Sequence, residues 1–137
     1  MLKKLLFSFA IILSMQNVTA KETKCLATAI YHEANAESVK GQIAVANVIM
    51  NRVESKDFPN SVCSVISQKG QFSWYNKTKH KYNDKTVAVA EKVLAKRVND
   101  VTNRSLFFHS GKNPYWTKKM KFVTKIGGHK FYRQREI

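Results

Sequence analysis

The segment that follows the first twenty residues carries the periodic apolar pattern of an amphipathic helix, which we predict to run from about residue 22 to residue 35. Its apolar stripe consists of Leu26, Ala29 and Ile30. Continued at helical spacing, the stripe leads to Glu33 and Glu37. The pattern therefore places two carboxylates on the face of the helix that should turn towards the interior of the fold.

Two more long helices and one short helix are predicted further along the chain. Ser38 is expected to be the N-cap of a largely buried helix, and Asp84 is expected to cap a third long helix. The short apolar segment 62–67 is predicted to be helical as well. The inward positions of the two long helices are Ile43, Ala46, Val48, Ile49, Met50 and Val53, then Val87, Ala90, Val93, Leu94 and Val98.

The pattern changes after residue 100. Residues 105–109 are predicted to form a short strand, and residues 121–126 and 129–133 are predicted to form a hairpin around the turn Gly127-Gly128. We therefore predict an α+β fold that is mostly helical, with a small antiparallel hairpin or sheet. We expect residues 21–137 to be one domain with a single hydrophobic core.

The beginning of the chain has the pattern of a secretory leader. Two lysines precede the apolar run 5–15, and the stretch that follows ends in Val18-Thr19-Ala20. We predict a signal peptide over residues 1–20, cleaved after Ala20, and a mature protein that is secreted, periplasmic or bound to the cell wall. An uncleaved membrane anchor is the alternative, although the apolar run is shorter than the ~20 residues that a spanning helix needs.

The charge of the mature chain indicates a polyanionic partner. Removing the leader leaves 22 basic residues against 9 acidic residues, a net charge of +13. Such an excess favours binding to cell-wall polymers, anionic lipid or nucleic acid, and the attraction weakens as salt rises. Export argues against nucleic acid, so we expect an anionic cell-wall surface as the partner of a monomeric protein.

The chain contains two cysteines, Cys25 and Cys63. In an exported protein an even number of cysteines suggests a disulfide, which here would link the start of the first helix to the segment after Pro59. Two free buried thiols are the alternative.

Glu33 is the candidate for acid catalysis. A carboxyl group that faces a poorly solvated interior has a raised pKa, because burial disfavours its charged form, and a general acid must hold its proton near neutral pH. The alternative is that both Glu33 and Glu37 lie at the edge of the helix or pair with some of the many lysines.

The residues around Glu33 resemble a known family, the cell-wall hydrolases of the SleB/CwlJ (spore-cortex-lytic) type. Members carry Tyr-x-Glu-Ala-x-x-Glu, then Gly-Gln-x-Ala-Val-Ala and Asn-Arg-Val, which correspond here to residues 31–37, 41–46 and 51–53. The later fragments are Phe58-Pro59-Asn60, Val62-Cys63-x-Val65-Ile66, Gln71-Phe72-Ser73-Trp74, Asn113-Pro114-x-Trp116 and Ile126-Gly127-Gly128-His129-x-Phe131-Tyr132. The chain departs from the pattern at Asn35-Ala36, where an arginine-glycine pair is common, and at Gly70 and Asn76, where some relatives have cysteines.

The resemblance implies a lysozyme-like, peptidoglycan-cleaving domain that acts on the glycan strand as a lytic transglycosylase without a cofactor or metal, and it places the catalytic glutamate at Glu33. A transglycosylase needs one carboxyl group, because the hydroxymethyl oxygen of the sugar attacks in place of water. Glu37 could be the second carboxylate of a hydrolase, but we favour a structural bond from it to Arg52 or to a lysine. Both a bacterial remodelling enzyme and a viral lysis protein (endolysin) fit this reading.

The loop 69–76 supplies candidate sugar-binding residues, because amide, hydroxyl and aromatic groups hold and stack sugar rings. The candidate substrate-binding residues are Glu37, Gln71, Ser73, Trp74, Tyr75, His109 and Trp116. Within the loop we assign Phe72 to the core and Trp74 to the cleft. His109 and Trp116 are the weaker candidates.

Two other functions compete with this hypothesis. A zinc amidase would use His32, His109 or His129 as ligands, but the second histidine of a His-Glu-x-x-His motif is missing at Ala36. A non-catalytic basic module would bind anionic wall polymers or lipid, with Glu33 as a structural residue.

Overall fold

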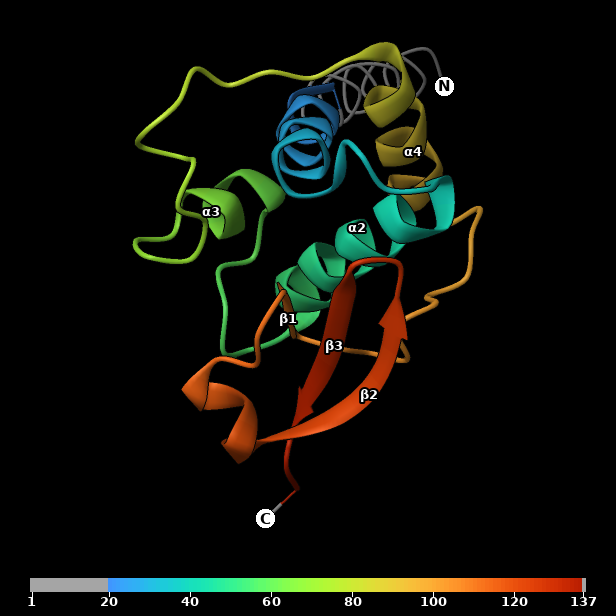
Figure 1. Ribbon diagram of the computed structural model, residues 1–137. Helices are drawn as coiled ribbons and strands as arrows, with labels where there is room; N and C mark the ends of the chain where they lie inside the picture. Colours follow the sequence, from blue (N-terminus) through green and yellow to red (C-terminus); the bar gives the residue numbers. More distant parts are fainter. Residues whose placement is uncertain (1–19, 137) are drawn as a thin grey trace, which may run out of the picture.

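A computed structural model describes residues 20–136 of the 137-residue chain. Helices pack together on one side of the molecule, and a small sheet lies on the other side (Figure 1). An N-terminal helix covers residues 20–34 of the described chain. It is followed by α2 (Val39–Glu54), α3 (Val62–Ser67), α4 (Asp84–Leu94), β1 (Phe107–Ser110), the 3-10 helix η1 (Tyr115–Lys119), β2 (Met120–Ile126) and β3 (His129–Gln134).

Side-chain caps fix where the helices begin. The Ser38 hydroxyl accepts a hydrogen bond from the Gly41 N–H at 3.2 Å, so the predicted cap of α2 is confirmed. The predicted cap of α4 is wrong, because Asn83 occupies that position and Asp84 is the first helical residue. Asn83 accepts from the Thr86 N–H, and Thr86 accepts from the Asn83 N–H, which forms a reciprocal capping box.

Helix α4 is shorter than its apolar pattern suggests. It ends at Leu94, and Lys96 has a φ of 56°, which a continuing helix does not allow. Val98 therefore packs from the following loop and not from the helix.

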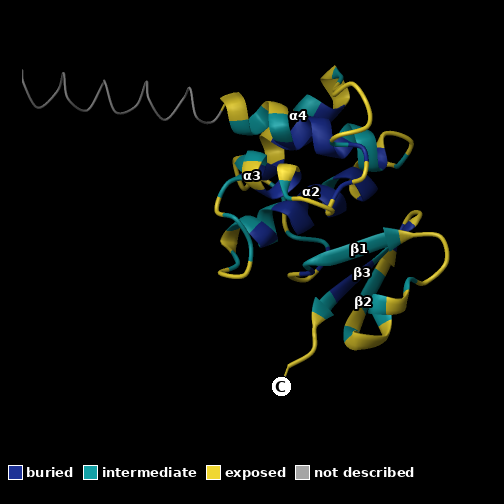
Figure 2. Cartoon of the chain, turned by 90° about the vertical axis from the view of Figure 1, so that its left-hand side faces the viewer, coloured by how far each residue is buried: buried dark blue, intermediate teal, exposed yellow. Residues whose placement is uncertain are grey.

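Helix α2 is buried on two adjoining faces, which explains why its apolar residues are so dense. One face, including Val45 and Ile49, packs into the core between the helices. The other face, through Ala44 and Val48, packs against Phe131 of the sheet. In Figure 2 this helix is buried along most of its length between the two parts of the molecule.

The sheet has three antiparallel strands in the order β1-β3-β2. The predicted hairpin is confirmed, and its turn needs Gly127, which has a φ of 57°. The first strand begins two residues later than the predicted residue 105 and pairs with the last strand of the chain, Phe108 opposite Phe131. The resulting α+β architecture, mostly helical with a small antiparallel sheet, is the predicted fold class.

The two cysteines form a disulfide, as predicted. Cys25 of the N-terminal helix is linked to Cys63 of α3, with 5.3 Å between their Cα atoms. Within residues 20–136, no helix combines the length and apolar character that crossing a membrane would require. The predicted leader falls almost entirely on residues 1–19, outside the described part of the chain.

Candidate active site

Glu33 lies in the last turn of the N-terminal helix and is half-buried. Its Oε1 atom accepts a hydrogen bond from the indole N–H of Trp74 at 3.0 Å. Because an indole nitrogen only donates, this contact assigns Oε1 as the acceptor and leaves Oε2 as the oxygen that would carry a proton. The bond joins the end of the helix to the loop 69–76.

Burial raises the pKa of Glu33 above its ordinary value of 4.5. The Trp74 hydrogen bond and the positive charge of Arg52 oppose this shift, because both favour the ionised carboxylate, but the effect of burial is larger. Glu33 thus combines a raised pKa with groups that stabilise its charged form. A carboxyl group in that environment suits a role in which it first donates a proton and later accepts one.

Arg52 is the charged residue that α2 places beside Glu33. Its side chain is only 5% exposed, and its Nε donates to the carbonyl oxygen of Leu106 at 2.8 Å. A terminal nitrogen donates to Gln71 Oε1 at 3.3 Å. Burial lowers the pKa of Arg52 to about 10, while the charge of Glu33 opposes that effect, so Arg52 stays charged at neutral pH.

Aromatic rings enclose the Arg52 guanidinium. Its central carbon lies 5.0 Å from the ring centre of Phe58 and 5.7 Å from the ring centres of Phe72 and Phe107. These distances allow cation–π attraction, which helps to hold the charge in a desolvated position. The arginine is therefore fixed both by hydrogen bonds and by stacking.

An open groove of about 350 Å³ begins at Arg52. It is lined by Arg52, Gly70, Gln71, Phe107, Phe108, Trp116 and Met120. The groove thus combines aromatic rings, one amide and one cation, which are groups that can stack on and hydrogen-bond to a small ligand. We refer to it below as the Arg52 groove.

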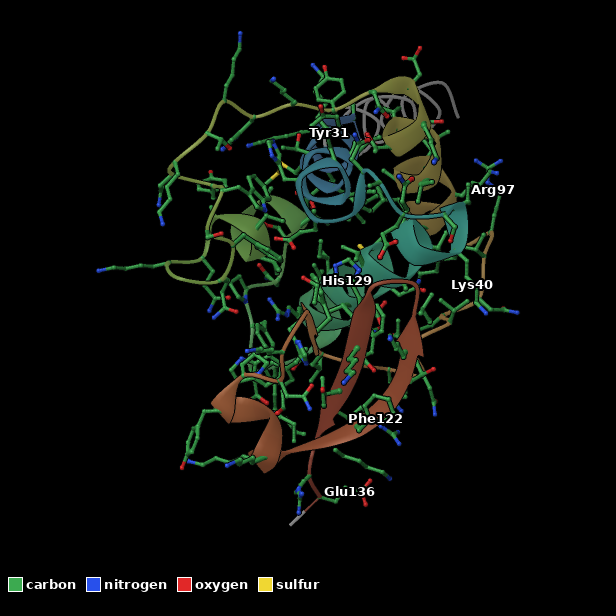
Figure 3. All side chains as sticks on the ribbon, viewed as in Figure 1. Tyr31, Lys40, Arg97, Phe122, His129 and Glu136 are labelled. Atoms are coloured by element: carbon green, nitrogen blue, oxygen red, sulfur yellow. A yellow bond between two sulfur atoms is a disulfide. The ribbon has the colours of Figure 1, made fainter. Side chains whose placement is uncertain are left out.

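The Glu37 carboxylate is bonded neither to Arg52 nor to a lysine, which were its expected partners. Its Oε1 accepts a hydrogen bond from the Gly128 N–H at 2.7 Å and lies 3.3 Å from Nδ1 of His129. Figure 3 shows His129 at the end of the sheet that lies nearest the helices. Glu37 therefore ties the turn after the N-terminal helix to the β2–β3 hairpin, which supports the structural role that we favoured for it.

The loop residues do not all face the groove. Trp74 was expected in the cleft but is 8% exposed and belongs to the core, with its ring stacked on His32 at 4.5 Å between ring centres. Its burial against this core leaves its faces unavailable to a sugar, and it reaches the site only through the bond to Glu33. Phe72 is a core residue, as predicted.

The remaining loop candidates differ in exposure. Gln71 lines the Arg52 groove. Ser73 is exposed on the loop. Tyr75 is half-buried against the helical core, with its ring 4.7 Å from that of His80. Of the predicted loop residues, the structure therefore brings Gln71 to the groove and Trp74 to Glu33.

His109 and Trp116 lie together on the sheet. Nε2 of His109 is 2.9 Å from the hydroxyl oxygen of Tyr132, and its ring is stacked on that of Tyr132. Trp116 meets the edge of His109 at 5.7 Å and also lines the Arg52 groove. Trp116 is therefore well placed for a ligand, whereas His109 supports the rings behind it.

The three histidines of the zinc hypothesis are not brought together. His32 accepts a hydrogen bond from the Lys81 N–H at 3.0 Å, His109 contacts Tyr132, and His129 lies beside Glu37. Among residues 20–136, no group of three His, Cys, Asp or Glu side chains is arranged to hold a metal ion. The separate positions of these histidines do not favour the zinc amidase hypothesis.

Five groove residues were not among the predicted site residues, namely Arg52, Gly70, Phe107, Phe108 and Met120. Arg52 sits within a dense apolar pattern, and its only sequence signal was the Asn-Arg-Val fragment. The phenylalanines read simply as strand residues.

Comparison with known proteins identifies the family of the chain. Residues 36–132 match the family described as Cell Wall Hydrolase, a range that begins just after Glu33. The spore cortex-lytic enzyme of Bacillus subtilis is 51% identical over 45 residues, which are 33% of this chain and 15% of that protein. The spore cortex-lytic enzyme of Bacillus cereus is 44% identical over 52 residues, 38% of this chain and 20% of that protein. The chain thus spans a fifth or less of the length of these two relatives.

Two solved structures resemble the fold over most of its length. The catalytic domain of the germination-specific lytic transglycosylase SleB from Bacillus anthracis has a TM-score of 0.71 at 29% identity, covering 82% of this chain and 93% of that one. The catalytic domain of Bacillus cereus SleB has the same score and identity, covering 82% and 89%. With the family match over residues 36–132, these findings show that the chain belongs to the Cell Wall Hydrolase family.

Proposed function

We propose that this protein cleaves the bond between N-acetylmuramic acid and N-acetylglucosamine in peptidoglycan, as a lytic transglycosylase with Glu33 as its general acid and base. The observation that carries the proposal is the environment of Glu33. It is a carboxyl group with a raised pKa, bonded through one oxygen to Trp74 and in electrostatic contact with Arg52, which lines the groove. The lytic transglycosylase named among the structural neighbours supports the same reaction class.

In the first step, protonated Glu33 gives its proton to the glycosidic oxygen as the bond to the muramic acid breaks. The sugar acquires oxocarbenium character, and Glu33 becomes a carboxylate. The Trp74 N–H and the nearby Arg52 charge stabilise that carboxylate, because both interactions favour its ionised form. They therefore act in the state that follows proton transfer.

In the second step, the ionised Glu33 takes the proton from the C6 hydroxyl group of the same muramic acid, and the C6 oxygen bonds to C1. The product is a 1,6-anhydro sugar, and Glu33 is protonated again for the next turnover. One carboxyl group thus completes the cycle without a net change in its charge.

The contacts of the Glu37 carboxylate with the hairpin favour the transglycosylase route over hydrolysis. A hydrolase needs a second carboxylate to attack the sugar or to activate water. Glu37 is the next acidic residue along the chain, but its carboxylate accepts a hydrogen bond from the Gly128 N–H of the hairpin and lies beside His129. We therefore assign to Glu37 a positioning role and not a catalytic one.

The proposal includes export of the protein. A wall polymer is reached outside the cytoplasm, and the Cys25–Cys63 disulfide suits an oxidising compartment. Edman sequencing of protein recovered from the cell envelope should give Lys21 as the first residue if the leader is cleaved after Ala20. An intact Met1 terminus would instead point to the uncleaved anchor.

The deciding experiment compares Glu33→Gln with the wild type on purified sacculi. Glutamine keeps the shape and can still accept the Trp74 bond, but it cannot donate the proton. We expect the variant to fold, to bind sacculi and to lose about a thousandfold or more in turnover, in line with the loss of a general acid. Glu91→Gln, an exposed change on α4, is the matched control and should leave turnover unchanged.

Mass spectrometry of the products identifies the reaction. Muropeptides that end in an anhydro sugar are expected. A reducing end would indicate a hydrolase, and a freed peptide would indicate an amidase. Lysis that survives Glu33→Gln would contradict the catalytic role and favour a binding or membrane-disrupting module.

A further inference from the structure

The positive charge of this protein is concentrated in the sheet and its loops. Residues 101–135 contain nine lysines and arginines and not a single aspartate or glutamate. The preceding residues 21–100 contain 13 basic and 8 acidic residues, so the helical part is far more balanced. The proposed mechanism uses none of the nine basic residues of the sheet region.

Like charges also face each other across the sheet. Lys121 is paired with Arg133, and Lys125 is paired with Lys130. Like charges directly opposite on neighbouring strands destabilise a sheet. Within residues 20–136 the only carboxylate at ion-pair distance from a basic side chain is Glu37, beside His129, so no carboxylate of the described chain neutralises these four side chains.

Protection of a free sheet edge does not explain this arrangement. Strand β2 is an edge strand, where lysines discourage pairing with another sheet. However, Lys130 and Arg133 belong to β3, the central strand. A central strand has no free edge to protect, so edge protection does not account for these two side chains. Lys130 donates to Asn113 Oδ1 at 3.1 Å, which is a neutral partner and leaves its charge uncompensated.

An exposed aromatic ring accompanies these charges. Phe122 is 52% exposed on β2, between Lys121 and the β-bulge that precedes Thr124. Figure 3 shows it farther along the sheet from the helices than His129. An exposed ring beside lysines offers both a stacking surface and a charge contact.

This surface continues from the Arg52 groove. A second open depression of about 490 Å³ is lined by Met120, Lys121, Phe122, Arg135 and Glu136. Met120 lines both this depression and the Arg52 groove. A polymer that occupies the groove can therefore run on along β2 without leaving the protein surface.

We propose that Lys121, Phe122 and Lys125, the β2 strip, bind the part of the peptidoglycan strand that lies beyond the cleaved bond, with the polymer running along the free edge of β2. Lys121 lies on the face of the sheet that carries Phe131, and Phe122 and Lys125 lie on the other face, so the three side chains flank this edge from its two sides. The lysines would contact the carboxylates of the stem peptides, and Phe122 would stack on a sugar ring. The identity of the polymer rests on the proposed function. The anionic nature of the ligand follows from the charge of the surface itself.

The test uses a charge-deleted strip and a matched control. The strip variant is Lys121→Gln with Lys125→Gln, two exposed side chains. The control is Lys24→Gln with Lys92→Gln, which removes the same charge from exposed positions on two helices. Binding to intact sacculi is measured in the Glu33→Gln background by sedimentation, so that the result does not depend on cleavage.

We expect the strip variant to raise the Kd for sacculi by about tenfold, the effect of two partly solvated charge contacts, and to reduce the salt dependence of binding. The control should change the Kd by less than about twofold. In otherwise active protein, the strip variant and Phe122→Ala should raise KM on long glycan strands. Their kcat values, and their activity on a short disaccharide-repeat fragment that ends before the strip, should be unchanged.

The inference fails if the control weakens binding as much as the strip variant, because the effect would then be one of net charge. It also fails if the strip variant loses affinity only for walls that retain phosphate-containing polymers and not for walls stripped of them by hydrofluoric acid. Loss of binding to anionic lipid vesicles with unchanged binding to sacculi would assign the strip to a membrane instead. A different result would separate the two proposals. If the Glu33→Gln protein binds sacculi through the strip but the wild-type protein yields no cleavage products, the proposed reaction is wrong and the binding role of the strip stands.

Discussion

At the scale of single residues, the site depends on the contact between Trp74 and Glu33. The indole N–H donates to Oε1 at 3.0 Å while the indole ring packs in the core. The tryptophan is therefore held by packing, and it holds the carboxyl group in turn. This rigidity gives Glu33 a fixed orientation before substrate arrives.

Replacing Trp74 with phenylalanine should change how activity depends on pH. The hydrogen bond favours the ionised carboxylate, so its loss raises the pKa of Glu33 further. Activity requires protonated Glu33 and falls as pH rises through that pKa, so the alkaline limb of the kcat/KM profile should move to higher pH. We also expect kcat to fall about tenfold because the carboxyl group is less well oriented. A limb that stays in place or moves to lower pH would contradict the assigned role of the bond.

Glu33→Gln should make the protein more stable at neutral pH. The folded state raises the pKa of Glu33 above its unfolded value, so the fold is penalised wherever the unfolded chain is ionised. The penalty is absent below the unfolded pKa and grows as pH rises through the folded pKa. Urea unfolding at pH 7.5 should therefore give a larger free energy of unfolding for the variant, and the gain should disappear below about pH 4. Equal stability at both pH values would show that burial of the carboxylate costs little.

The residues differ in how far sequence alone could place them. Glu33 was predictable because a carboxylate on an apolar stripe has few ways to avoid burial. Trp74 was not, because a large aromatic residue in a loop fits a core and a cleft equally well until the packing around it is known. The role of Arg52 could not be predicted from its helix alone. Aromatic rings from three other segments surround its guanidinium, and only the fold brings them there.

At the scale of elements, the β2–β3 hairpin is attached to the helices through its turn. The Gly128 N–H donates to Glu37, and a Cβ atom on Gly127 would lie 3.0 Å from Oε2 of the same carboxylate. The turn therefore needs glycine both for its backbone conformation and for the close approach of Glu37. This contact fixes the sheet relative to the end of the helix that carries Glu33.

Gly127→Ala should destabilise the protein by about 1–2 kcal/mol through its positive φ alone, with a further loss from crowding of Glu37. Gly111→Ala is the matched control, because Gly111 has a φ of 75° but no atom within 4 Å of its added Cβ. Chemical denaturation should show the larger loss for Gly127→Ala. Equal losses would mean that Glu37 moves aside at no cost.

The helices were easier to predict than the elements of the sheet region. Periodicity and a nearby hydroxyl group located α2, because both signals are local. The cap of α4 was misplaced by one residue because Asn83 and Asp84 are both good caps, and only the bond to Thr86 distinguishes them. The 3-10 helix Tyr115–Lys119 was missed because its sequence has no apolar periodicity. It forms where the chain turns between β1 and β2, which local sequence does not reveal.

At the scale of the whole molecule, one covalent link joins two helices that flank the site. The Cys25–Cys63 disulfide connects the N-terminal helix with α3, which leads into the loop that carries Trp74. Cys25→Ser with Cys63→Ser should lower the free energy of unfolding by about 3–4 kcal/mol, the loop-closure value for a separation of 38 residues. The measurement is urea unfolding of both proteins. A reductant should destabilise the wild type by a similar amount and leave the double variant unchanged.

The chain has two tryptophans, and both lie at the site: Trp74 is bonded to Glu33, and Trp116 lines the groove. Ultraviolet emission from the unlabelled protein should therefore sense two separate events. Light from one indole should follow the titration of its carboxyl neighbour, and light from the other should follow the arrival of a sugar. A Trp116→Phe protein would isolate the first signal, so proton transfer and ligand docking become observable in a fluorimeter without any attached dye.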